Sequence, residues 1–251
     1  MVAERVYGLH AVEAALGDRP GRCRALWVQA GRRDRRLDGV RKAAVAAGIA
    51  VREVPRRALD ELVPDARHQG VVLEVQGSAP GGEAELAALV EGLSAPAFLL
   101  VLDGVQDPHN LGACLRSADA AGADAVIVPK DRAAGLTPVA RKVACGAAEA
   151  IPLFVVTNLA RTLRALREAG VWVYGAAGEA GQSLYETDLR GPLALVLGGE
   201  GRGLRRLTRE HCDALVRIPM AGTVASLNVS VAAAVALFEA RRQRGTPEHR
   251  P

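Results

Sequence analysis

The sequence predicts an α/β protein in which a small α/β domain precedes a larger domain built on a parallel sheet. From residue 97 onward, short apolar runs alternate with helical patterns, as in strands joined by crossover helices. Several of these runs are apolar throughout, as expected for parallel strands covered on both faces. A Gly-Ser-Ala-Pro-Gly-Gly stretch starting at residue 77 has a linker composition. We therefore predict domains at 1–76 and 97–244, a linker at 77–96 and a polar tail at 245–251.

The first domain is expected to have a compact, βαβ-like order. Gly48 follows a helical pattern and suits a helix stop. The predicted elements are a helix at 11–16, a strand at 25–28, a helix at 37–47 and strands at 50–54 and 71–75.

The second domain is expected to alternate strands with helices whose ends can be located. Thr137 precedes Pro138, which is the pattern of an N-cap followed by proline at the first helical position. Asn158 should cap the following helix, which should stop at Gly170. The predicted strands lie at 98–102, 125–128, 153–156, 171–174, 193–197 and 215–218.

The excess positive charge lies in the first domain. Residues 1–76 hold fourteen Lys and Arg against ten Asp and Glu, whereas residues 77–251 hold eighteen of each, so the first part accounts for the net charge of +4. Such a surplus is also found on ordinary solvated surfaces. The density of arginines between residues 19 and 36 favours a nucleic-acid contact surface.

The cysteines predict a reduced protein without a metal site. The four cysteines form no Cys-x-x-Cys pair, and no His lies at zinc-ligand spacing apart from the adjacent His211 and Cys212. The uncharged run at 218–238 contains Pro219, Gly222 and Asn228, so we do not expect it to span a membrane. No apolar signal core opens the chain. We expect a soluble, cytoplasmic protein.

Three segments with polar residues follow predicted strands. They are residues 103–112, the Gly-rich segment 198–203 and the segment 219–228. Ligands bind at the carboxyl ends of strands in open α/β sheets, so the three segments are expected to form one site. Segment 198–203 lacks the Lys and Ser/Thr of a phosphate loop, and its glycines do not match the dinucleotide fingerprint.

Each polar residue of these segments also has a plain structural explanation. Asn110 suits a helix N-cap, Arg116 a surface salt bridge, and Ser226 the N-cap of the last helix, with Asn228 a weaker candidate for that cap. Glu200 among glycines is unusual for a phosphate site and indicates contacts with hydroxyl groups or a cation.

Taken together, three motifs resemble the SpoU/TrmH family of RNA ribose 2′-O-methyltransferases. The first is Asn110-x5-Arg116-Ser117-Ala118, the second Leu197-Gly198-Gly199-Glu200-Gly201-x-Gly203, and the third Ile218-Pro219-Met220-x5-Ser226-Leu227-Asn228-x-Ser230. They occur in order and cover residues 97 to about 244. The sequence His68-Gln69-Gly70-Val71 and the small first domain resemble the L30e-like RNA-binding domain of the rRNA-modifying members.

The resemblance implies a SPOUT-class fold, in which the C-terminal segment threads a deep trefoil knot that holds S-adenosylmethionine, and a homodimer. It assigns the catalytic role to Asn110, Arg116, Glu200, Ser226 and Asn228. It assigns cofactor contacts to Leu197, Gly198, Gly199, Gly201, Ile218, Met220 and Leu227, with Ala also acceptable at position 199. RNA contacts are expected from Arg32, Arg33, Arg35, Arg36, His68, Gln69 and Arg116.

The activity that the resemblance implies is S-adenosylmethionine-dependent 2′-O-methylation of a guanosine in 23S ribosomal RNA. Family proposals make the arginine, here Arg116, the base. A guanidinium stays protonated with a pKa of about 12.5 or above, so a grip on the adjacent phosphate suits Arg116 better. Methylation of tRNA or of another rRNA site, a nucleotide-binding enzyme of Rossmann type and a non-catalytic RNA-binding protein are the alternatives.

Overall fold

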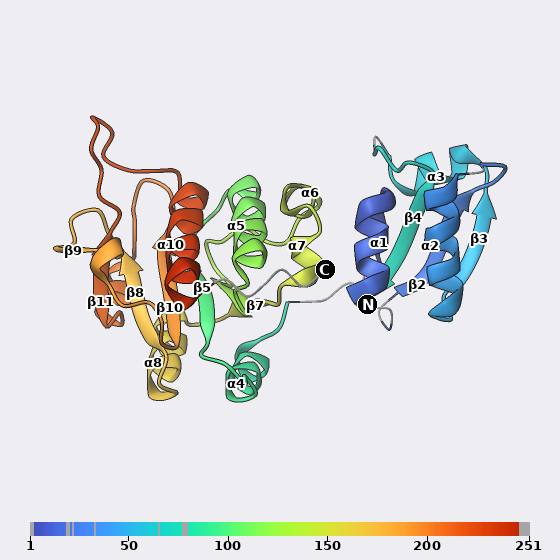
Figure 1. The fold of residues 1–251 in the computed structure, drawn as a ribbon. Coiled ribbons are helices and arrows are strands. Elements are labelled where there is room, and N and C mark those ends of the chain that lie inside the picture. Colours follow the sequence, from blue (N-terminus) through green and yellow to red (C-terminus); the bar gives the residue numbers. More distant parts are fainter. Residues whose placement is uncertain are drawn as a thin grey trace. The chain divides into compact units, whose positions relative to one another are not determined.

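The computed structural model describes residues 3–18, 21, 23–32, 34–64, 66–76 and 80–245. The chain divides into two compact units, residues 1–79 and 80–251, and each is described by itself (Figure 1). Arg33, residues 77–79 of the expected linker and residues 246–251 of the expected tail lie outside the described residues.

The first unit is a four-stranded mixed sheet with the strand order β1-β4-β2-β3. Strand β4 is antiparallel to both β1 and β2, and β2 is parallel to β3. The strands are β1 (Ala3–Tyr7), β2 (Cys23–Gln29), β3 (Ala50–Val54) and β4 (Val71–Gln76). The helices are α1 (Leu9–Asp18), α2 (Arg35–Ala46) and α3 (Arg56–Leu62). The predicted strands and helices of this unit are confirmed, whereas β1 and α3 were not anticipated.

Helices cover both faces of the first sheet. Leu26, Leu37 and Leu73 are fully buried in the core under α1 and α2, while Leu59 of α3 is buried with Val72 on the opposite face. Asp34 caps α2 by accepting hydrogen bonds from the backbone N–H groups of its first turn. The unit therefore has a core of its own.

The second unit is a seven-stranded sheet in the order β7-β6-β5-β10-β8-β11-β9, in which every pairing is parallel. Its strands are β5 (Phe98–Asp103), β6 (Ala125–Pro129), β7 (Leu153–Val156), β8 (Trp172–Ala176), β9 (Gln182–Ser183), β10 (Leu193–Gly198) and β11 (Ala214–Arg217). Its helices are α4 (Glu83–Glu91), α5 (Pro108–Ala121), α6 (Pro138–Ala144), α7 (Ala147–Ala150), α8 (Leu159–Glu168), the 3₁₀ turn η2 (Leu184–Glu186), α9 (Arg206–Glu210) and α10 (Val229–Arg244). The six predicted strands are confirmed; the two-residue β9 was not predicted.

Two hydrophobic clusters, one on each face of the sheet, make this unit a three-layer α/β structure. Leu100 and Leu102 of β5 face the cluster that α5 and α10 cover, and Leu99 and Val101 face the cluster that α8 covers. All six residues of β5 are buried, which is why its sequence is apolar up to Asp103. The predicted fold class, a parallel α/β domain behind a small α/β domain, is confirmed.

Strand β10 enters the sheet late in the chain, between the earlier strands β5 and β8. The end of α10 then packs against the segment that precedes β10. Gln243 donates to the carbonyl of Thr187, and Arg244 donates to the carbonyl of Leu189. The trefoil knot stays a prediction from the family resemblance.

The expected linker belongs to the second unit from Pro80 onward. The N–H of Gly81 donates to the carbonyl of Leu153, and its carbonyl accepts from Val155, so the chain at Gly81 lies beside β7. A Cβ at Gly81 would lie 2.7 Å from the ring of Phe154. Helix α4 follows in the same stretch. Among the described residues, no helix is long and apolar enough to cross a membrane.

Candidate active site at the carboxyl edge of the parallel sheet

Asp103 joins the ends of β5 and β10. Its carbonyl accepts from the N–H of Gly199 at 2.9 Å. Its buried carboxylate accepts from the backbone N–H of Arg205 at 2.8 Å and from the Arg205 guanidinium at 2.5 Å. The Gly-rich segment is therefore fixed at both ends to the strand that precedes the first motif.

Asn110 lies inside α5 and is not its N-cap. Asp107 is the N-cap, accepting from the N–H of His109, and Pro108 occupies the first helical position. This corrects the prediction that Asn110 caps the helix. The amide of Asn110 is free to bond outward, and its Nδ2 donates to Glu200 Oε1 at 2.5 Å.

Asn228 completes a three-residue network with Asn110 and Glu200. Its Nδ2 donates to Asn110 Oδ1 at 3.1 Å, while its own Oδ1 accepts from the N–H and hydroxyl of Ser230 at 2.8 and 2.7 Å. Asn228 is thus the N-cap of α10, which corrects the preference for Ser226 in that role. The structure joins one side chain from each of the three motifs.

A buried thiol lies beneath this network. Burial raises the pKa of the Cys114 thiol to about 12, and the negative charge of Glu200 adds to the effect. A thiol with this pKa stays protonated at neutral pH, so Cys114 is a packing residue and not a nucleophile or base.

The glycines of the second motif are needed because other backbone segments pass very close. A Cβ at Gly198 would lie 2.0 Å from the carbonyl carbon of Gly203, and a Cβ at Gly199 would lie 2.2 Å from the carbonyl oxygen of Gly104. Alanine at position 199, which the motif comparison allowed, therefore requires the backbone at Gly104 to move. Gly201 and Gly203 have positive φ angles of 75° and 62°, which favour glycine.

Arg116 lies further along α5 and is not bonded to the network. It is exposed, and its Nη1 contacts the Sγ of Cys145 at 3.6 Å. Cys145 ends α6 in a left-handed conformation with a φ of 53°. The guanidinium has no carboxylate partner among the described residues of the second unit, so its donors remain available to a ligand.

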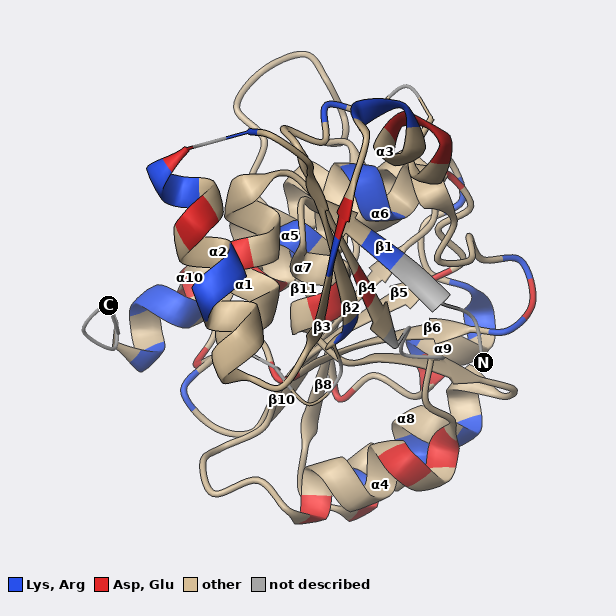
Figure 2. Cartoon of the chain, turned by 90° about the vertical axis from the view of Figure 1, so that its right-hand side faces the viewer, with Lys and Arg blue, Asp and Glu red and all other residues tan. Residues whose placement is uncertain are grey.

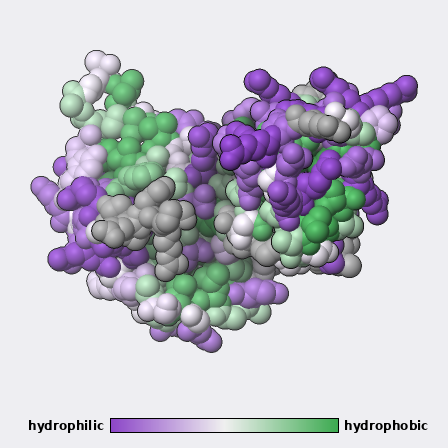
Figure 3. All heavy atoms as spheres, turned by 45° about the vertical axis from the view of Figure 1, so that its right-hand side comes forward, coloured by the Kyte–Doolittle hydropathy of each residue, from purple (hydrophilic) through white to green (hydrophobic). Residues whose placement is uncertain are grey.

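The segment between β11 and α10 projects from the body of the second unit (Figure 1). Met220 is 37% exposed, Val224 is 61% exposed, and apolar atoms are visible on the projecting segment in Figure 3. Ser226 is exposed, Leu227 is half-buried, and neither is bonded to the network. Of the predicted catalytic set, the structure brings Asn110, Glu200 and Asn228 together and leaves Arg116 and Ser226 apart.

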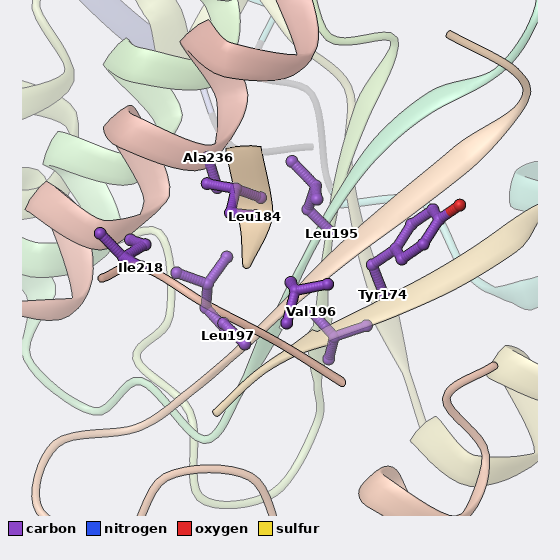
Figure 4. A pocket seen from close by; sticks show the side chains of 9 residues that line it. Tyr174, Leu184, Leu195, Val196, Leu197, Ile218 and Ala236 are labelled. Carbon is purple, nitrogen blue, oxygen red and sulfur yellow. The ribbon is translucent and has the colours of Figure 1, made fainter. Parts of the chain in front are cut away.

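A small apolar pocket lies beside the predicted cofactor segments (Figure 4). It includes Leu197, at the end of the second motif's strand, and Ile218, at the start of the third motif. Its lining residues are Tyr174, Ala176, Leu184, Leu195, Val196, Leu197, Val216, Ile218 and Ala236. Sequence reasoning did not identify the contribution of Tyr174 and Leu184, which come from segments without a motif.

His68 is part of the interior of the first unit. It is 5% exposed; its Nδ1 accepts from the N–H of Gly70 at 3.0 Å, and its Nε2 lies 2.9 Å from Asp60. This corrects the expectation of a direct RNA contact, because both ring nitrogens are used within the domain. Gln69 is likewise engaged, since its Oε1 accepts from the N–H of Leu9 at 3.1 Å.

The predicted RNA-binding arginines of the first unit differ in whether they already bond to other residues of that unit. Arg32 binds the carbonyl of Gln69 and the carboxylate of Asp34, and Arg36 contacts Glu13. Arg35 is exposed. On α3 the arginines form ion pairs one helical turn away, and Figure 2 shows both signs of charge on that helix. The first unit therefore presents positive charge that is partly neutralised internally.

Asp103 and Arg205 were missed by the sequence reasoning. The signal that could have identified Asp103 is a lone carboxylate at the end of a fully apolar strand, because a buried charge requires a partner. The sequence could not name Arg205, because 102 residues separate the two and other arginines stand next to it.

The chain belongs to the SpoU rRNA Methylase family, whose model matches residues 97–238. Residues 5–80 match a second model, the substrate-binding domain of RNA 2′-O ribose methyltransferases.

Individual relatives cover almost the whole chain. The sequence is 58% identical to the 23S rRNA (guanosine-2′-O-)-methyltransferase RlmB of Pseudomonas putida, over 96% of this chain and 97% of that protein. It is 54% identical to RlmB of Escherichia coli K12, over 97% of this chain and 100% of that protein. The crystal structure of the SpoU methyltransferase AviRb of Streptomyces viridochromogenes in complex with AdoMet superposes with a TM-score of 0.76 at 25% identity, covering 96% of this chain and 90% of that one.

No group of three potential metal ligands occurs among the residues that the structure describes.

Proposed function

We propose that this protein transfers a methyl group from S-adenosylmethionine to the ribose 2′-oxygen of a guanosine in 23S rRNA. The observation that carries the proposal is the Asn110–Glu200–Asn228 network, which joins the three family motifs at one edge of the sheet. The near full-length similarity to two enzymes with that printed activity supports the choice of substrate.

The cofactor site is proposed at the apolar pocket and the loops above it. Leu197 and Ile218 line this pocket and would contact an adenine ring, and glycine at position 198 adds no side chain next to it. Met220 and Leu227 of the projecting segment would lie over the bound cofactor. S-adenosylmethionine supplies an electrophilic methyl group when it is bound.

The proposed role of the network is to position the target ribose. Glu200 accepts from Asn110 and keeps a second carboxylate oxygen for the ribose hydroxyl groups. Asn228 is fixed by its helix cap and holds Asn110 from the other side. Orientation of this kind supplies about 7–11 kcal/mol of barrier reduction in well-aligned reactions.

We assign the phosphate next to the target ribose to Arg116. Its guanidinium can form two parallel hydrogen bonds to a phosphate, and it stays charged at neutral pH. Positive charge at this position favours the deprotonated 2′-hydroxyl, and the proton leaves to phosphate or water. Ser226 and Gly201 complete the proposed site from the two loops.

We further propose that the protein acts in the cytoplasm as a homodimer and that the first unit holds rRNA through Arg32, Arg35, Arg36 and their neighbours. The second unit exposes Val139 on α6 and Val231 and Phe238 on α10, each 43–49% accessible, and both helices pack against α5. A dimer would cover apolar side chains of this kind. Light scattering of the purified chain tests the oligomeric state.

The proposal is tested by mapping 2′-O-methylation on rRNA from a strain that lacks the gene. We expect one guanosine of 23S rRNA to lose its ribose methyl group and to regain it when the gene is restored. Loss of a methyl group from tRNA alone would favour a tRNA enzyme. An unchanged methylation pattern would favour a non-catalytic RNA-binding protein.

A further inference from the structure

We propose that three cations of the second unit, Lys130, Arg132 and Lys142, hold the phosphates of the RNA strand that flanks the target ribose. We call these three residues the cationic rim. The inference rests on the proposed function for its ligand, and it places part of the RNA contact in the catalytic unit, outside the first domain.

The rim lies on two segments, the loop after β6 and helix α6, and both contact the part of the chain that carries the first motif. Lys130 and Arg132 follow β6, whose carboxyl end lies beside that of β5. The N–H of Ala134 donates to the carbonyl of Val105 at 2.7 Å, which holds this loop against the segment leading to Asn110.

Lys142 belongs to α6, which packs closely on α5. A Cβ at Gly112 would lie 2.4 Å from the carbonyl oxygen of Ala140, so the two helix backbones are in contact there. The carbonyl of Lys142 accepts from the thiol of Cys145, and that sulfur is also the contact of Arg116. The backbone of Lys142 is therefore linked through Cys145 to the proposed phosphate-binding arginine.

The three rim cations are exposed and have no carboxylate partner among residues 80–245. Most other exposed cations of this unit are neutralised: Arg190 pairs with Asp188, Arg206 with Glu210 and Arg242 with Glu239. Two exposed arginines outside the rim also lack a carboxylate partner among the described residues of this unit besides Arg116: Arg164, which contacts the ring of His211 at 3.2 Å, and Arg202 in the Gly-rich segment.

The rim cations differ from the paired cations of this unit in that their side-chain hydrogen-bond donors remain free of the residues that the structure describes. Cations that serve solubility or stability can be paired locally, whereas cations that bind an external phosphate must keep their donors free. Asp131 lies between Lys130 and Arg132 and reduces the charge of that loop, so the rim carries a net charge of about +2 with Asp131 included. Phosphates on an RNA strand are spaced closely enough to meet several such cations.

The test compares two triple variants with the same loss of charge. One is Lys130→Gln/Arg132→Gln/Lys142→Gln, and the matched control is Arg190→Gln/Arg206→Gln/Arg242→Gln, which removes three paired arginines. Binding of deproteinised 23S rRNA, taken from a strain lacking the gene, is measured by filter binding between about 50 and 200 mM salt. Methyl transfer and S-adenosylmethionine affinity are measured separately.

For the rim variant we expect rRNA affinity to fall about tenfold and the slope of log K against log salt to decrease by about 2. Cofactor affinity and the rate at saturating RNA should stay at the wild-type values. A rim variant that binds rRNA like the control would overturn the inference while leaving the proposed function intact. If the wild-type protein methylates no rRNA but the rim variant alone loses rRNA binding, the rim is retained as an RNA contact and the proposed function is refuted.

Discussion

Glu200 accepts a hydrogen bond at 2.5 Å from Asn110, a residue 90 positions earlier in the chain. The bond joins the loop after β10 to the helix after β5, and these two strands are neighbours in the sheet. Two motifs that are far apart in sequence thus become one polar site because parallel strands end at the same edge.

Exchanging the charge between these partners tests whether their bond matters for the reaction. Asn110→Asp alone places two carboxylates in contact, and we expect the rate of methyl transfer to fall at least about 100-fold through loss of the aligned geometry. Adding Glu200→Gln supplies a donor for the new carboxylate at position 110, so the double variant should recover part of that loss.

The single variants and the double variant form a double-mutant cycle, for which kcat is measured at saturating rRNA and cofactor. Losses that multiply in the double variant, with no recovery, would mean that the two side chains act independently. Because Glu200 is exposed, we do not expect these substitutions to destabilise the fold. Thermal unfolding of each variant checks this.

Asp103 and Arg205 form the structural tie beneath the site, and Asp103→Asn should weaken the fold. The carboxylate is buried and accepts from both the backbone and the guanidinium of Arg205. Because Arg205 is 41% exposed and can regain water, we expect a loss of about 2 kcal/mol in the free energy of unfolding by urea.

The control for Asp103 is Asp188→Asn, which disrupts the solvent-exposed pair with Arg190. Its urea midpoint should equal that of the wild type, because exposed ion pairs contribute little. Equal midpoints for both variants would contradict the structural role of Asp103.

Gly198→Ala should damage the loop that carries Glu200. The new Cβ would meet the backbone of Gly203 and Leu204 within 2.3 Å, and backbone cannot move aside as a flexible side chain can. We expect reduced thermal stability and loss of S-adenosylmethionine binding measured by calorimetry. Gly181→Ala, where nothing lies within 4 Å of the added atom, should leave both unchanged. Wild-type cofactor affinity in Gly198→Ala would show that the loop is not part of the cofactor site.

The cysteines should differ sharply in reactivity. Burial raises the pKa of the Cys114 and Cys212 thiols to about 12, whereas Cys145 is exposed. At pH 8 a maleimide should therefore modify Cys145 well before Cys114 and Cys212, and bulk at Cys145 should inhibit methyl transfer by displacing Arg116. Mass spectrometry of the modified peptides identifies the site.

Cys145→Ser is the control for this inhibition. The variant should remain active and should resist the maleimide. Inhibition of Cys145→Ser at the wild-type rate would remove Cys145 and its contact with Arg116 from the explanation.

The sequence allowed the parallel sheet to be predicted because its strands are buried on both faces and therefore apolar along their whole length. Asn110, Glu200 and Asn228 were identifiable from motif spacing, but their mutual bonds were not, since those depend on β10 lying next to β5. The N-caps were misassigned to Asn110 and Ser226 because Asp107 and Asn228 are equally good capping residues nearby. His68 was placed among RNA contacts since burial of a polar ring cannot be read from its neighbours in sequence.

Methyl transfer by the purified protein to 23S rRNA is the direct test of the proposed activity. Labelled S-adenosylmethionine is incubated with 23S rRNA from a strain lacking the gene, and the digested nucleosides are analysed by mass spectrometry. We expect one 2′-O-methylguanosine for each rRNA molecule, and none with Arg116→Ala. A methyl group on a base, or transfer to tRNA but not to 23S rRNA, would contradict it.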